Sequence, residues 1–84
     1  ANPQLKARAQ DAMNQWRQLI IRIIEDGIKR DEFNAVDGDE LASLIIAQIE
    51  GSMMMSKLFD SDLHLRRAVI YLHEYLQNNV IKAT

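Results

Sequence analysis

The sequence predicts an all-α fold of three long helices in an antiparallel up-down arrangement. Three stretches repeat apolar residues at the helical spacing, and none alternates as a β-strand does. The one proline, Pro3, stands at the start of the first stretch, where its fixed backbone angle suits a helix. With 84 residues the chain has room for one small core. We therefore expect a single all-α domain over residues 1–84.

Composition excludes several classes of function. Apolar residues make up 48% and charged residues 26%, which is typical of a folded globular chain. The absence of cysteine removes disulfides, thiolate catalysis and cysteine-bound zinc. A net charge of −2 gives little general attraction to nucleic acid, and no apolar run is long enough to span a membrane. The chain begins Ala-Asn-Pro without a signal peptide, so we expect a piece of a longer, cytoplasmic protein.

The first helix is expected over residues 4–30. Its apolar residues fall on one arc of the helical wheel and its polar residues on the opposite arc. Gly27 and the charged run that follows are expected to mark its fraying end. In the short connector, Phe33 is expected to tuck back under a helix end. The apolar arc comprises Leu5, Ala9, Ala12, Met13, Trp16, Leu19, Ile20, Ile23 and Ile24.

The second helix is expected over residues 38–59, with Asp37 as N-cap and Glu40 completing a capping box. Only Ser43, Glu50 and Lys57 form a narrow solvent stripe, and the rest of the surface is apolar or small. A helix that is apolar nearly all round must be buried nearly all round. Because so short a chain cannot supply that cover, we expect this helix to face a second molecule or a missing part of its own chain.

A ridge of small and polar residues, Gln48, Ser52 and Ser56, runs along the second helix at intervals of four. Within one chain this ridge would receive the third helix; in a homodimer it would meet the same helix of a second copy, forming a four-helix bundle. The second helix has more apolar surface around its circumference than one chain can cover, which favours the homodimer. The expected dimer interface comprises Ile45, Gln48, Ile49, Ser52, Ser56, Phe59, Arg66, Ile70, His73 and Gln77.

The third helix is expected over residues 61–81, capped by Asp60 or Ser61. It carries both histidines, which are nine residues apart; His64 and His73 therefore point to opposite sides and cannot share a metal ion. The acidic pairs are ordinary solvated charges and lack the apolar surroundings that acid–base catalysis uses. No phosphate loop or nucleophile motif is present. We expect neither enzymatic activity nor a metal or other cofactor.

Three consecutive methionines, residues 53–55, have two interpretations. Methionine commonly fills an irregular core, and it also forms the adaptable wall of a pocket for apolar small molecules. Trp16 on the first helix offers a flat surface for such a ligand. Both interpretations can hold, because consecutive helical residues point about 100° apart.

Residues 24–33, Asp37 and residues 41–52 together resemble the C-terminal region of TetR-type transcriptional regulators. In that family a helix commonly ends in a Gly-Ile-x-x-Gly-Glu-Phe-like stretch, and an acidic residue then opens a long helix with an Ala-x-x-Glu-Gly-like step. Here residues 27–33 read Gly-Ile-Lys-Arg-Asp-Glu-Phe. Asp31 replaces the second glycine, so a differently built turn is expected there.

The resemblance implies a homodimer formed through residues 39–59 and 62–81, and a pocket for small hydrophobic effectors. Effector binding would change the spacing of two N-terminal helix-turn-helix heads and release DNA, but no such head lies in this sequence. It thus implies the dimerisation and partial effector-binding domain of a repressor. The alternative is a small helical protein–protein interaction module without a ligand. The residues expected to reach the effector are Met13, Trp16, Ile20, Met54 and Met55.

Overall fold

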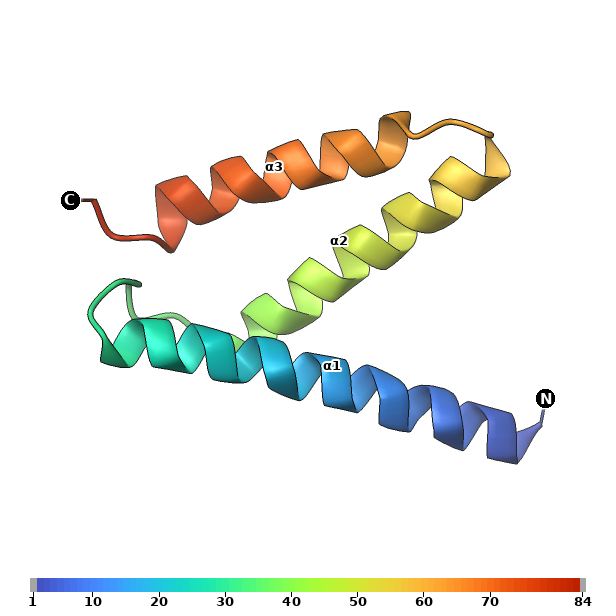
Figure 1. Cartoon of the computed structure of the whole chain (residues 1–84), viewed down its shortest axis with the longest axis horizontal. Coiled ribbons are helices and arrows are strands. Elements are labelled where there is room, and N and C mark those ends of the chain that lie inside the picture. The colour runs from blue at the N-terminus through green and yellow to red at the C-terminus, as the bar shows by residue number, and fades with distance from the viewer. Residues whose placement is uncertain (1, 84) are drawn as a thin grey trace.

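The computed structural model describes residues 2–83 and contains three helices (Figure 1). They are α1 (Pro3–Lys29), α2 (Gly38–Leu58) and α3 (Leu63–Asn79). Within the described part of the chain the only β-type pairing is an isolated bridge between Phe33 and Ile81. The predicted all-α fold of three long helices is confirmed.

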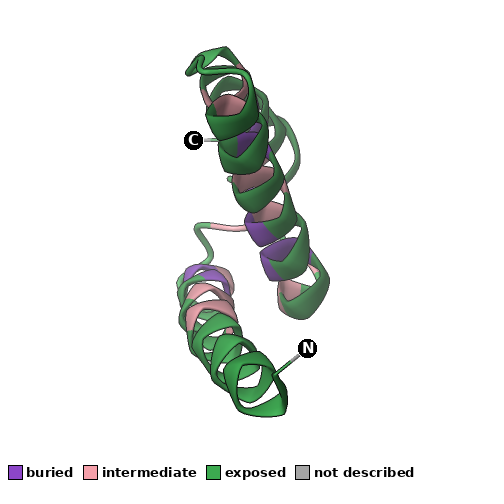
Figure 2. Ribbon diagram, turned by 90° about the vertical axis from the view of Figure 1, so that its right-hand side faces the viewer, coloured by how far each residue is buried: buried purple, intermediate pink, exposed green. Residues whose placement is uncertain are grey.

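The three helices form a flat zigzag that is one helix thick. The Cα atoms extend over 46 × 31 × 13 Å. Helix α2 packs against both α1 and α3, whereas α1 and α3 do not pack against each other within residues 2–83. Figure 2 shows that the first half of α1 is exposed throughout, because no other described segment covers it. A single layer of helices has no second layer to cover its faces.

Side-chain caps start α1 and α2 where the sequence indicates. The Asn2 side chain accepts a hydrogen bond from the Gln4 amide at 2.9 Å, and Pro3 is the first helical residue. The Asp37 carboxylate accepts one from the Glu40 amide at 3.1 Å, which confirms Asp37 as the N-cap of α2. Each cap satisfies an amide that has no partner within its helix.

Helix α1 ends in a well-formed turn and does not fray at Gly27. The Glu32 amide donates to the Gly27 carbonyl at 2.9 Å and the Asp31 amide to the Ile28 carbonyl at 3.1 Å, which is the Schellman pattern. Asp31 has a φ of 62°, the left-handed conformation for which glycine is preferred. A different turn was expected here because Asp31 replaces a glycine. Asp31 nevertheless adopts a backbone conformation that glycine also adopts.

The best-buried part of the molecule is the corner where α1 meets α2, which we call the closed corner. Its core consists of Ile24, Leu41, Ala42 and Val80. The ring of Phe33 lies over Gly27, confirming that it tucks under the helix end; a Cβ at Gly27 would overlap the ring. The closed corner thus needs glycine for close approach rather than for an unusual backbone angle.

The C-terminal segment fastens the closed corner. The Asn34 amide donates to the Val80 carbonyl at 2.7 Å, and the Lys82 amide donates to the Glu32 carbonyl at 2.9 Å. Lys82 also forms an ion pair with Asp31. Because residues 80–82 leave the helix to make these bonds, α3 ends at Asn79, two residues before its predicted end.

The start of α3 was predicted two residues too early. Asp60 has a φ of 49° and belongs to the turn that closes α2, so it cannot cap the next helix. Asp62 is the N-cap residue but its side chain makes no capping bond. Instead, the Ser61 hydroxyl accepts from the Leu63 amide at 3.1 Å. A further amide of the first turn, that of Leu65, is bonded by the Ser56 hydroxyl of α2 rather than by a local cap.

Candidate assembly and ligand surfaces

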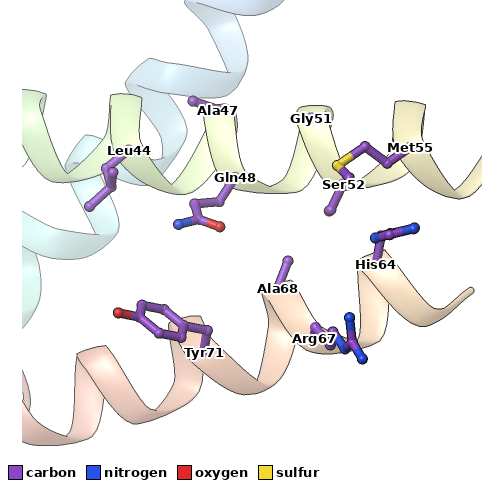
Figure 3. Close-up of a pocket in the computed structure, with 10 residues that line it drawn as sticks. All are labelled: Leu44, Ala47, Gln48, Gly51, Ser52, Met55, His64, Arg67, Ala68 and Tyr71. Atoms are coloured by element: carbon purple, nitrogen blue, oxygen red, sulfur yellow. The ribbon is translucent and has the colours of Figure 1, made fainter.

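The ridge of Gln48, Ser52 and Ser56 faces α3 of its own chain. Ser52 is only 7% exposed, and its hydroxyl donates to the Ile49 carbonyl at 2.9 Å. The Ser56 hydroxyl accepts from the Leu65 amide at 3.1 Å and so caps the first turn of α3. In Figure 3, Gln48 and Ser52 point toward α3 and Ala68 points back toward α2. Ser52 therefore packs within the chain, as in the alternative interpretation, and its contact with a second copy stays a prediction.

The other residues of the expected dimer interface differ in exposure. On α2, Ile45 and Ile49 are half-buried, and Ile45 packs against the closed corner. The remainder lies on exposed surface, where Arg66 pairs with Asp62 of its own helix at 2.6 Å. These exposed members are Phe59, Arg66, Ile70, His73 and Gln77.

The uncovered apolar surface of α2 lies between the ridge and the solvent stripe. We call it the outer flank; its residues are Leu44, Ala47, Gly51, Met54, Met55 and Leu58, and all six are exposed. Met54 is 64% and Leu58 71% exposed. A Cβ at Gly51 would have no neighbour within 4 Å. The helical spacing groups these residues, but only the positions of α1 and α3 reveal that this flank is the open one.

A groove of about 680 Å³ separates the outer flank from α3 (Figure 3). Leu44, Gly51 and Met55 line it from α2. From α3 it is lined by His64, Arg67 and Tyr71, and on the α2 side Gln48 and Ser52 add polar groups to the apolar wall. His64 is half-buried and its ring lies 5.6 Å from that of Phe59, centroid to centroid.

The expected ligand-binding residues do not share a cavity within residues 2–83. Met55 lines the groove between α2 and α3, and Met54 is exposed on the same flank. Trp16 lies beside a shallow hollow formed by α1 alone, Met13 is exposed, and Ile20 packs against the closed corner. The described chain therefore provides separate apolar walls rather than an enclosed effector pocket.

The described residues hold no arrangement suited to metal binding. No group of three histidine, aspartate or glutamate side chains converges among residues 2–83. Every buried side-chain nitrogen and oxygen there has a hydrogen-bond partner. None of the described helices is long and apolar enough to cross a membrane. What the geometry offers instead is apolar surface, on the outer flank of α2 and on the first half of α1.

Comparison with known proteins identifies the family. The family described as "Tetracyclin repressor-like, C-terminal domain" matches residues 1–72. The crystal structure of a TetR transcriptional regulator from Chloroflexus aurantiacus J-10-FL is similar over 99% of this chain, with a TM-score of 0.95 and 34% sequence identity. This chain spans 42% of the length of that regulator. No curated protein matches significantly. The chain therefore belongs to the TetR family of transcriptional regulators, a non-enzymatic family, and corresponds to its C-terminal domain.

Proposed function

We propose that this chain is the dimerisation domain and one wall of the effector site of a TetR-like repressor. Its role is to couple small-molecule binding to the release of DNA by a helix-turn-helix domain elsewhere in the parent protein. The observation that carries the proposal is the outer flank, an uncharged apolar surface along α2 in a molecule only one helix thick. Monomeric proteins rarely leave such a surface exposed.

The proposed dimer surface differs from the one expected from the sequence. The inward residues of α2 already pack within the chain, so the outer flank replaces the ridge as the contribution of α2. Ala47 and Gly51 lie one turn apart at its centre, which allows another helix to approach closely. Phe59 at the end of α2 and Ile70 on the exposed side of α3 extend the surface. Two copies would then bury both helices in a four-helix bundle.

The effector part of the proposal uses the first half of α1. Met13 lies there on exposed surface, with Leu5 further toward the N-terminus, and Trp16 is half-buried at the end of this stretch. The regulator from Chloroflexus aurantiacus is more than twice the length of this chain, so a parent of similar size would supply further helices. These would close a pocket over α1, and ligand binding there would favour one of two spacings of the DNA-binding domains.

Sedimentation of the 84-residue chain tests the dimer. We expect a concentration-dependent monomer–dimer equilibrium. Leu58→Glu should weaken dimerisation by about tenfold or more, because it places a charge in the contact. Lys57→Glu, on the neighbouring solvent stripe, is the matched control and should leave dimerisation within a few-fold. A chain that stays monomeric alone but binds another protein's helix would support the interaction module instead.

Trp16 provides a direct test of the effector wall, since it is the only tryptophan in the chain. In the parent protein, titration with apolar small molecules should produce a fluorescence change that Trp16→Phe abolishes, and the same ligands should release DNA. Trp16→Phe removes the signal but should retain DNA release. Ligands that release DNA without any change at Trp16 would place the effector elsewhere.

A further inference from the structure

The last two turns of α2 carry three consecutive methionines, and all three side chains reach solvent. Met53 is 38%, Met54 64% and Met55 43% exposed. A thioether is the side chain that peroxide oxidises most readily in a chain without cysteine. A core-filling role does not account for methionine side chains that are this exposed.

The three methionines do not share one face. Successive helical residues point about 100° apart. Met54 and Met55 belong to the outer flank, with Gly51 and Leu58 beside them, whereas Met53 points to the other side of α2. Of the three, Met54 and Met55 alone therefore lie in the surface proposed for dimerisation, and Met53 provides an internal comparison on the same turn.

We propose that Met54 and Met55 are oxidation sites that control self-association of this domain. The inference depends on the proposed dimerisation through the outer flank. A sulfur lone pair attacks one oxygen of a hydroperoxide; the O–O bond breaks, an S–O bond forms, and water or an alcohol leaves after proton transfer. The sulfur loses two electrons, and the peroxide gains them. The product is a methionine sulfoxide, which is polar and is returned to methionine by sulfoxide reductases.

Oxidation of these two residues acts on the monomer–dimer equilibrium. In the free chain both side chains are exposed, and the proposed dimer would shield them. Each oxidised chain carries a new polar oxygen whose burial in the contact requires a hydrogen-bond partner, and the outer flank offers no charged or strongly polar side chain. Oxidised monomers therefore dimerise more weakly, and peroxide shifts the equilibrium toward monomer by mass action.

The first experiment follows the rate of oxidation. The chain is treated with hydrogen peroxide at protein concentrations above and below its dimer dissociation constant, and each methionine is read by mass spectrometry. Met54 and Met55 should oxidise at least about fivefold faster in the dilute sample, in proportion to the monomer fraction. Met53 and Met13 should oxidise at rates that do not depend on concentration. Equal concentration dependence at all four, or at none, would overturn the proposal.

The second experiment follows assembly. Peroxide-treated protein should dimerise about tenfold or more weakly in sedimentation, and treatment with methionine sulfoxide reductases A and B should restore it. The double variant Met54→Leu, Met55→Leu should dimerise normally and resist peroxide, while the control Met13→Leu should remain sensitive. If the untreated chain never dimerises, the proposed function fails. If it dimerises and peroxide has no effect, only the oxidation proposal fails.

Discussion

The two ends of α2 are built in opposite ways. At the closed corner its first turns lie against α1 and the C-terminal segment, and the core residues Leu41 and Ala42 are buried. At the other end, from Met53 to Phe59, only the ridge side is covered and the apolar side chains face solvent. The core cluster of the single chain therefore lies at one end of α2, and its open apolar surface lies at the other.

The glycines of α1 and α2 sharpen this difference, because the same substitution should have opposite effects at them. Gly27→Ala should destabilise the chain by about 2–3 kcal/mol, since the new Cβ overlaps the Phe33 ring and displaces it from the closed corner. Urea unfolding at low protein concentration measures this loss. In a Phe33→Ala background the overlap disappears, and Gly27→Ala should then stabilise by about 1 kcal/mol through helix propensity. A loss in both backgrounds would show that the ring is not the cause.

Ser52→Glu tests the packing between α2 and α3 at the second end of α2. The sequence predicts Ser52 in a dimer interface, and the structure places it between α2 and α3 of one chain. It should therefore lower the free energy of unfolding of the monomer by about 2 kcal/mol, because a charge enters a nearly buried position. Ser43→Glu, on the exposed stripe, should change it by less than about 0.5 kcal/mol. A Ser52→Glu monomer of normal stability would contradict the inward placement.

Gly51→Ala probes the uncovered side of the same segment. Nothing lies within 4 Å of the added Cβ, so alanine should stabilise the monomer by about 1 kcal/mol through its higher helix propensity. If another helix approaches Gly51 in the dimer, the same substitution should weaken dimerisation. Thermal unfolding and sedimentation of one variant thus separate folding from assembly. A stabilised monomer with unchanged dimerisation would move the helix contact away from Gly51.

The smallest expected effect is at the turn between α2 and α3. Asp60 occupies the left-handed region at a helix C-terminus, where glycine is less strained and an acidic side chain opposes the helix dipole. Asp60→Gly should stabilise the chain by about 0.5–1 kcal/mol. Asp31→Gly is the comparison at the closed corner; it relieves the same backbone conformation but removes the ion pair with Lys82, so its gain should be smaller. Equal gains would mean that this ion pair contributes nothing.

The sequence alone determined the helices and the local caps, because these depend on neighbours a few residues apart. Asp37, Pro3 and the apolar periods predict where α1 and α2 begin, and the stretch around Gly27 and Phe33 carries the family resemblance. The ends of α3 were missed because they depend on distant partners: Ser56 caps its first turn, and the connector at Asn34 draws residues 80–82 out of the helix.

Only the tertiary structure decided which side of α2 is open. On a helix that is apolar nearly all round, the wheel separates the ridge from the outer flank but gives no reason to bury either one. The packing of α3 against Ser52 buries the ridge and leaves Met54 and Leu58 in solvent. Burial depends on how the helices are placed relative to one another. The turns at Asp31 and Asp60 and the hydrogen bonds of residues 80–82 with the connector set that placement.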